Sequence, residues 1–372
     1  MTAIALASLL VVLYTYAGYP SLMMLWSKLA PRGVSGRDDY EPTVSVCFSA
    51  CNGARHLADK IRSLQELDYP RGKLEFLVFS DGSTDDTELI ARELSATDPR
   101  IRLLSSIERF GKPTALNRLC RAATGEILLL CDVRQPLAER SLRALLRPLA
   151  DPSVGCVSGS LVLRGNTGAG MYWRYERAIR TAESRVGSVV GVSGSIYATR
   201  RAEMPELPSD ILLDDVFVPM KLALSGRRRI VLAGDAEAYD DACDDQHEFA
   251  RKVRTLAGNY QLFAKMPGLL VPGWNPIWFQ MMSHKLLRLL CPWALIALVL
   301  SSAALAFSSN TAVIETEFWR ALLSAQVAFY IFAALGTRAG RVGALGRTFL
   351  VLNAAAVVGL WRFLRGSQTV LW

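Results

Sequence analysis

Long stretches without a single charged residue constrain the fold of this chain most. The run Thr2–Ser27 contains no Asp, Glu, Lys or Arg, and neither does Leu289–Ile314. Because about 20 mostly apolar residues in a helix cross the hydrocarbon core of a bilayer, both runs predict membrane-spanning helices. Ala321–Thr337 and Thr348–Trp361 are shorter runs of the same kind. We therefore expect four spans, with three as the main alternative.

Basic residues beside these runs predict their orientation. They follow the first run, precede the second and separate the last two: Lys28, Arg32, Arg37, Lys285, Arg288, Arg338, Arg341 and Arg347. Since basic residues favour the cytoplasmic side, all of them belong there, and the acidic Asn310–Glu317 loop belongs outside. Arg362 and Arg365 disagree, because a four-span count places them outside. The first run has its basic residues after it and no A-x-A site, so it predicts an uncleaved anchor.

The residues between the first two spans have ordinary globular composition. We expect four parts: an N-terminal transmembrane helix (1–30), a cytoplasmic domain (40–262), an interfacial helical segment (263–288) and about three C-terminal transmembrane helices (289–366). The uncharged stretch Met266–Ser283 contains several prolines and tryptophans, which suit a helix on the membrane face better than a span. The expected location is the inner membrane, multi-pass, with the domain in the cytoplasm.

The cytoplasmic domain alternates predicted strands and helices. Strands are expected at Thr43–Ser49, Leu74–Ser80, Ile101–Ser105 and Ile127–Asp132, and helices at Leu57–Leu67, Asp85–Ala96 (capped by Ser83) and Lys112–Ala123. Such alternation predicts a mostly parallel, Rossmann-like sheet, in which ligands bind beyond the carboxyl ends of the strands. Asp81 and Asp132 stand at two of these ends. A carboxylate there needs a partner, so the sequence predicts a binding site at this edge.

Several common site types are absent from the sequence. No G-x-G-x-x-G follows the first strand, no G-x-x-x-x-G-K-[ST] occurs, and no G-x-S-x-G is present, which excludes dinucleotide oxidoreductases, P-loop enzymes and the usual serine hydrolases. Cys47 and Cys51 lack the further ligands of a zinc site. The net charge of +8 is explained by the basic residues flanking the spans and by contact with membrane lipids. Nucleic acid is not an expected partner.

A series of short motifs in order carries a family resemblance. They are Ser49-Ala50-Cys51-Asn52, Ser80-Asp81-Gly82-Ser83, Gly111-Lys112-Pro113-Thr114-Ala115-Leu116-Asn117, Asp132-Val133-Arg134, Gly191-Val192-Ser193-Gly194-Ser195-Ile196-Tyr197, Leu213-Asp214-Asp215 and Arg251-Lys252-Val253-Arg254-Thr255. In this order, followed by membrane helices, they resemble the inverting glycosyltransferases of family two. The likeness is strongest to the membrane-embedded group of cellulose, chitin and hyaluronan synthases. The resemblance implies a GT-A fold.

The resemblance also implies a role for each motif. Ala50, Asn52 and Asp81 would hold the nucleotide of a sugar donor, with Lys112 nearby, and the expected donor in this group is a UDP-sugar. Asp132 would bind Mg²⁺ or Mn²⁺, and Arg254 would contact the diphosphate. Gly194 and Asp214 would lie on the acceptor side. Asp215 would be the general base, because inversion requires removal of a proton from the acceptor hydroxyl.

Four positions depart from the family pattern. Ser80 and Gly53 replace acidic residues at the edges of the nucleotide motifs. Arg134 replaces the second carboxylate of Asp-x-Asp, which leaves one ligand for the metal or places a cation near the phosphates. Thr255 replaces the tryptophan on which an acceptor sugar would stack, which argues for single-sugar transfer over chain extension.

Without the resemblance, several of these residues have simpler interpretations. Asp214 and Asp215 would be a solvated acidic pair and Lys112 a surface lysine. Asp85 and Asp86 suit the first turn of a helix, where the macrodipole favours acids. Asp235, Asp240, Asp241, Asp244 and Asp245 fit a solvated loop, since they lack an EF-hand pattern.

The predicted function is transfer of a sugar from a nucleotide sugar to a lipid-linked or polysaccharide acceptor in cell-surface or exopolysaccharide synthesis. Polysaccharide-assembly proteins would then be further partners. Two alternatives stay open. One is a glycolipid synthase with a ceramide or polyprenyl-phosphate acceptor. The other is a catalytically degenerate subunit that binds a nucleotide sugar.

Overall fold

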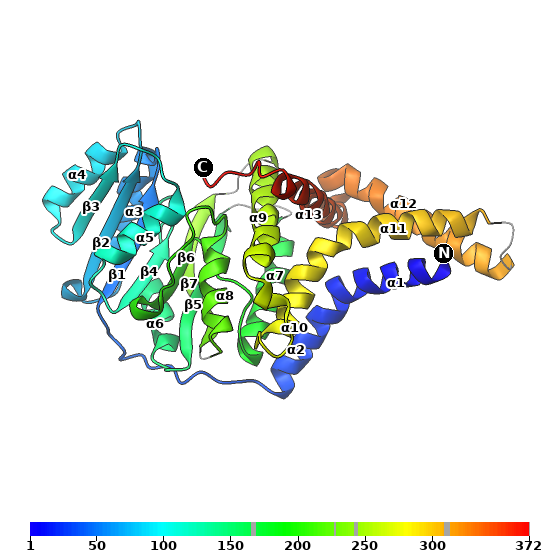
Figure 1. Ribbon diagram of the computed structural model, residues 1–372, viewed down its shortest axis with the longest axis horizontal. Coiled ribbons are helices and arrows are strands. Elements are labelled where there is room, and N and C mark those ends of the chain that lie inside the picture. The colour runs from blue at the N-terminus through cyan, green and yellow to red at the C-terminus, as the bar shows by residue number, and fades with distance from the viewer. Residues whose placement is uncertain (165–168, 227, 242–244, 309–312, 372) are drawn as a thin grey trace.

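A computed structural model of the 372-residue chain describes residues 1–164, 169–226, 228–241, 245–308 and 313–371. It consists of an α/β domain and an elongated bundle of helices that projects from one side of it (Figure 1). The domain contains a seven-stranded sheet of order β3-β2-β1-β4-β6-β5-β7. Its strands are β1 (Val44–Ala50), β2 (Leu74–Asp81), β3 (Ile101–Ser106), β4 (Ile127–Cys131), β5 (Val154–Arg164), β6 (Ile196–Arg200) and β7 (Arg229–Asp241).

The sheet is mostly parallel, as the alternating pattern predicts. β1 pairs in parallel with β2 and β4, β2 with β3, and β5 with β7. β6 alone among these runs antiparallel, to both β4 and β5. This reversal lies directly after the Gly191–Gly194 segment, so it brings that segment to the carboxyl end of β4 beside Asp132.

Helices cover both faces of the sheet. They are α3 (Ala54–Gln65), α4 (Thr87–Thr97), α5 (Lys112–Ala122), α6 (Ser141–Leu149), α7 (Ala169–Val186), α8 (Asp214–Leu224) and α9 (Asp245–Lys265). Residues of α3 and α6 share one buried cluster with Phe48, and residues of α5 and α8 share another with Cys47. Because successive strand residues point to opposite faces, β1 is buried on both sides.

The predicted elements of the first half are confirmed with small shifts. One detail is wrong: α4 begins at Thr87 after Asp86, and Ser83 does not cap it. The Ser83 hydroxyl instead accepts a hydrogen bond from the Asn52 amide (3.2 Å). Asp85 accepts bonds from the amides of Thr87 and Ala54 (both 3.1 Å), so it joins the start of α4 to the turn after β1.

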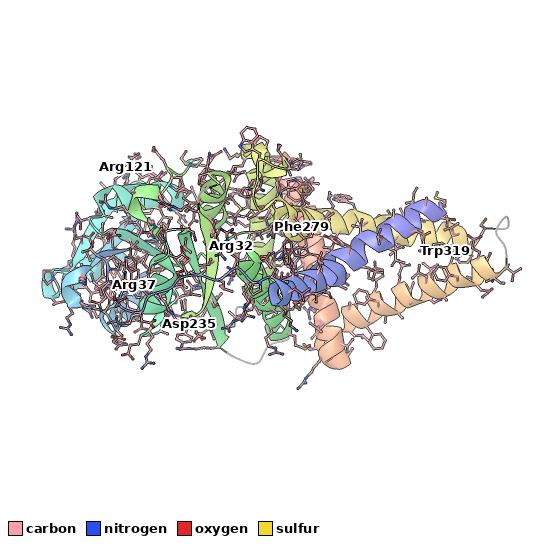
Figure 2. The ribbon with its side chains drawn as sticks, turned by 90° about the horizontal axis from the view of Figure 1, so that it is seen from below. Arg32, Arg37, Arg121, Asp235, Phe279 and Trp319 are labelled. Atoms are coloured by element: carbon pink, nitrogen blue, oxygen red, sulfur yellow. The ribbon has the colours of Figure 1, made fainter. Side chains whose placement is uncertain are left out.

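The described residues include three apolar helical segments that are long enough to cross a membrane: Thr2–Leu29, Trp278–Ala306 and Val313–Leu364. The first joins α1 (Thr2–Leu13), η1 (Tyr14–Gly18) and α2 (Tyr19–Leu29); the second joins α10 (Trp278–Gln280), η5 (Met281–Leu286) and α11 (Leu287–Ala306). In Figure 2, Phe279 lies where these helices meet the domain, and Trp319 lies toward their far end.

The third segment contains both of the last two apolar runs of the sequence. It consists of α12 (Val313–Leu335), a short turn η6 (Gly336–Ala339) and α13 (Gly340–Leu364). α13 packs along α9 of the domain, so closely that a Cβ atom added at Gly359 would lie 2.9 Å from the Ala257 nitrogen. Val370, just beyond α13, contacts Gly111 in the domain. The first part of α13 packs on α12, and its later part packs on the domain, so whether Thr348–Trp361 crosses the membrane stays a prediction.

Arg362 and Arg365 lie at the end of α13 that is near the domain. The side of the membrane on which they lie stays a prediction. The segment 263–288 is not one interfacial helix. It contains the end of α9, the turn η4 (Pro267–Leu270), non-helical residues 271–277, and the start of the second apolar helix at Trp278.

Candidate active site

A cavity of about 1230 Å³ opens at the carboxyl end of β4, between the domain and the helices that leave it. Its polar wall includes Lys112, Asp132, Asp214, Asp215 and Arg254. Its far wall is formed by residues of α11 and α13, among them Leu289, Val351, Leu352 and Ala356. The cavity therefore connects the predicted catalytic residues with the apolar helices.

Lys112 is the centre of an ion cluster in this wall. It is the first residue of α5 and follows Gly111, whose φ of 85° lies in the region that favours glycine. Its ammonium nitrogen lies 2.8 Å from Asp132 Oδ1 and 3.3 Å from Asp214 Oδ1. Burial alone would lower the pKa of Lys112, but the two carboxylates outweigh burial and raise it above its ordinary value. Lys112 therefore stays charged and holds both acids in place.

Asp214 and Asp215 are the first two residues of α8. Because successive helical residues differ by about 100° around the axis, their side chains point into different surroundings. Both line the cavity, but Asp214 is 6% exposed and pairs with Lys112, and its buried Oδ2 has no hydrogen-bond partner among the described residues. Asp215 is half-buried.

Asp215 has a strongly perturbed carboxyl group. Burial raises its pKa to about 6, repulsion from Asp214 adds to the rise, and Lys112 partly opposes it. A carboxylate with this pKa is largely deprotonated at neutral pH and accepts a proton more readily than an ordinary aspartate. Its environment is therefore that of a general base.

The Gly191–Gly194 segment lies against Asp215. The Val192 amide donates a hydrogen bond to the Asp215 backbone carbonyl (3.0 Å). A Cβ atom added at Gly194 would lie 3.1 Å from Asp215 Oδ2, tighter than most Cβ contacts. Glycine at position 194 thus leaves room for the Asp215 carboxylate on the acceptor side of the cavity.

The predicted nucleotide-binding residues lie at or just beyond the carboxyl ends of β1 and β2. Asp81 is 1% exposed, and its two oxygens accept bonds from the Phe110 and Gly111 amides (both 2.8 Å). Asn52, at a left-handed φ of 53°, accepts a bond from the Thr84 amide (2.8 Å). Ala50 is buried at the end of β1. These residues fix the loops that border the strand ends; none of the three lines the cavity itself.

The last motif contributes to the cavity from α9. The half-buried Arg254 lines it, and the buried Arg254 Nε has no hydrogen-bond partner among the described residues. Thr255, in the tryptophan position, is exposed. Arg134 donates to Asp240 Oδ2 (2.6 Å), so this guanidinium is held by a buried carboxylate. Of the predicted acidic cluster, Asp244 lies outside the described residues, as does the side chain of Asp245.

Comparisons with known proteins agree with this geometry. The model of the family described as Glycosyl transferase family 2 matches residues 45–202. An N-acetylglucosaminyltransferase from Bradyrhizobium elkanii is 31% identical over 123 residues, which are 32% of this chain and 67% of that relative. The chain belongs to glycosyltransferase family 2.

Two further similar proteins match this chain over different shares of its length. An N-acetylglucosaminyltransferase from Rhizobium sp. (strain N33) is 27% identical over 217 residues, or 55% of this chain and 48% of the relative. The chain thus spans only about half the length of that protein. The mannosyltransferase PcManGT from Pyrobaculum calidifontis, solved in complex with GDP-Man and Mn²⁺, matches with TM-score 0.78 and 26% identity. That likeness covers 97% of this chain and 98% of PcManGT, so it includes the helices as well as the domain.

The residues of this family 2 domain fit a divalent cation at Asp132. Its side chain is 37% exposed and lines the cavity, and Lys112 contacts only Oδ1. Mg²⁺ commonly takes one or two carboxylates beside substrate phosphates and keeps several waters. No group of three or more potential ligands from His, Cys, Asp and Glu occurs among the described residues. Asp132 would therefore hold the ion together with the donor, not in an all-protein cage.

Sequence reasoning missed a buried polar network on the membrane side of this domain. His284 Nδ1 lies 2.6 Å from Glu183 Oε1, which also accepts a bond from the Tyr19 hydroxyl (2.6 Å). His284 Nε2 lies 3.2 Å from Glu176, which also pairs with Arg288. These residues come from α2, α7 and the second apolar helix, so only the fold brings them together. The signal in the sequence was Arg288 at the start of the second apolar run, whose charge the positive-inside rule already explained.

Proposed function

We propose that this chain is a membrane-bound glycosyltransferase that transfers a sugar, with inversion, from a nucleoside diphosphate sugar to a lipid-linked acceptor. The observation that carries this proposal is the shared cavity. Asp132 and Asp215 line it on the domain side, and apolar residues of α11 and α13 line it on the other. An acceptor with an apolar chain would lie along these helices while its head group reaches Asp215.

The proposed chemistry is a single displacement. An acceptor hydroxyl oxygen attacks the anomeric carbon, and its proton passes to the Asp215 carboxylate. The bond from that carbon to the diphosphate oxygen breaks, and its electron pair leaves with the nucleoside diphosphate. The raised pKa of Asp215 suits proton acceptance near neutral pH. Asp214 is not the base in this scheme, since it is buried against Lys112.

The leaving diphosphate needs positive charge. Arg254 offers a guanidinium to the cavity, and guanidinium groups bind phosphate oxygens in a bidentate manner. When bound at Asp132, Mg²⁺ or Mn²⁺ would stabilise the negative charge on the diphosphate. Lys112 keeps Asp132 oriented toward the cavity.

The identity of the sugar donor and the cellular role of the product extend this proposal. We favour a UDP-sugar, and the GDP-Man bound in PcManGT makes GDP-mannose the first alternative to test. The domain would lie on the cytoplasmic face of the inner membrane, and the products would serve cell-surface or exopolysaccharide synthesis. Thr255, in place of a stacking tryptophan, supports the addition of one sugar over chain extension.

The test is the Asp215→Asn variant of the purified full chain. This change keeps the shape of the side chain but removes the proton acceptor. We expect transfer to fall about 10²- to 10⁴-fold, the range for loss of a general base, with donor affinity nearly unchanged. Asp214→Asn is the matched control and should cost less. Near-wild-type turnover by Asp215→Asn would contradict the proposed mechanism.

A further inference from the structure

Two cations in the cavity wall have no carboxylate partner among the described residues. Arg180, on α7, donates from Nη2 to the Ser158 hydroxyl (2.8 Å) and to the Gly191 carbonyl (3.3 Å), but it forms no ion pair. Lys285, on η5, forms no hydrogen bond and no ion pair with any of the residues that the structure describes. Their neighbours differ: Arg288 pairs with Glu176, and His284 contacts Glu176 and Glu183.

Both cations approach the segment that holds Asp215. Arg180 reaches the Gly191 carbonyl, and Lys285 Nζ would lie 3.9 Å from a Cβ atom added at Gly191. The next residue, Val192, is hydrogen-bonded to the Asp215 backbone. All five residues line the same cavity. Arg180, Lys285 and the base therefore surround one site on the acceptor side.

The charge balance of this site favours an anion. Lys112 is neutralised by Asp132 and Asp214 on the donor side. On the acceptor side, Arg180 and Lys285 lie near the carboxylates of Asp215, Glu176 and Glu183. Glu176 and Glu183 are already bound by Arg288, His284 and Tyr19, which leaves Asp215 as the one carboxylate of the three without such a partner among the described residues. Burying a charged group without a partner is costly, and the cost falls when a ligand of opposite charge binds. A phosphate group would satisfy both cations.

The surroundings of the two cations also favour a ligand with an apolar part. Lys285 lies at the start of the second apolar helix, and Leu289, one turn further on, lines the same cavity. Val351, Leu352 and Ala356 of α13 continue the apolar wall. A ligand that matches both features has a phosphate head and a long hydrocarbon chain.

We propose that Arg180 and Lys285 bind the phosphate of a phosphorylated lipid acceptor and position it beside Asp215. This inference rests on the proposed function and specifies its acceptor. The phosphate either carries the sugar hydroxyl that attacks the donor or attacks the donor itself. In the second case its oxygen forms the new bond to the anomeric carbon, the nucleoside diphosphate leaves with the electron pair, and no proton has to be removed.

The experiment compares binding of a short-chain isoprenyl phosphate and of the corresponding isoprenyl alcohol to the full chain in detergent micelles. We expect wild type to prefer the phosphate at least tenfold. Lys285→Met and Arg180→Met should each weaken phosphate binding about 10- to 100-fold, as expected for charged hydrogen bonds, and leave alcohol binding unchanged. Lys285→Arg should restore most of the preference, because it keeps the cation.

Lys28→Met is the matched control. Lys28 is an exposed lysine at the domain end of another apolar helix and does not line this cavity. The Lys28→Met variant should bind the isoprenyl phosphate and the isoprenyl alcohol as tightly as wild type does. Equal losses from Lys28→Met and Lys285→Met would show general surface attraction and overturn the proposal. Equal loss of phosphate and alcohol binding in Lys285→Met would also overturn it, because Lys285 would then only balance the charge of Asp215.

Donor-nucleotide binding and the thermal unfolding midpoint, measured on each variant, show whether it is folded. If Lys285→Met does not fold, Arg180→Met and Lys285→Arg test the same claim. Transfer by Asp215→Asn separates the two proposals. Retained transfer in that variant to a lipid phosphate that carries a sugar hydroxyl would refute the general-base mechanism, while the phosphate site would stand if Lys285→Met still abolished the preference.

Discussion

The donor side and the acceptor side of the site differ in how their charges are balanced. On the donor side, Asp81 is held by two backbone amides, and Lys112 is held by two carboxylates. On the acceptor side, Arg180 and Lys285 face the cavity without a carboxylate partner among the described residues. The donor side is thus internally balanced, whereas we propose that an anionic ligand completes the acceptor side. On this proposal, substrate charge contributes most where the domain meets the apolar helices.

The test with the largest expected effect asks on which side of the membrane α13 ends. A reporter fused after Leu371 should read cytoplasmic, like one fused after residue 36, because α13 and Val370 lie against the domain. A reporter inserted at Glu315 should read external and serves as the control. An external signal after Leu371 would mean that α13 crosses the membrane and that its residues do not form the acceptor wall.

The second test removes the proposed metal ligand from the donor side. Asp132→Asn should lower transfer about 10²- to 10³-fold, the usual cost of losing one group that stabilises charge on the leaving atoms. A chelator should have a similar effect on wild type, and added Mn²⁺ should reverse it. Asp235→Asn, at an exposed position on β7 (Figure 2), is the control and should be active. Full activity of wild type in excess chelator would assign leaving-group stabilisation to basic side chains alone.

The smallest expected effect is a shift in pH dependence. Because Asp215 must be deprotonated to act as base and its pKa is about 6, kcat/KM should fall below that pH. Repulsion from Asp214 helps to raise this pKa, so Asp214→Asn should lower it and extend activity to more acidic pH. The measurement is kcat/KM between pH 4.5 and 8 for both proteins, with roughly even steps of half a unit. An upward shift of the midpoint in Asp214→Asn would contradict this electrostatic coupling.

The difference between the donor side and the acceptor side also explains which features could be predicted from the sequence. The strands ending at Asp81 and Asp132, and the turn before Lys112, are encoded locally by apolar runs and by Gly111, so their places were predicted correctly. The Asp214–Asp215 pair was found by its motif, but its helical conformation was not. Arg180 and Lys285 lie more than a hundred residues apart, and no local pattern indicates that both approach Gly191. The packing of α13 along α9 was not predicted, because composition indicates an apolar run but not its neighbours in the fold.

The most direct test of the account is transfer of labelled sugar into lipid by the purified full chain. Labelled UDP-sugars and GDP-mannose are supplied in turn with Mg²⁺ or Mn²⁺ and a membrane lipid extract, with and without prior phosphatase treatment of the lipids. The account predicts label in the organic phase with at least one donor, and its loss after phosphatase treatment and in Asp215→Asn. Label appearing only in water-soluble products, with no lipid product from any donor, would contradict a lipid acceptor at the membrane face of this site.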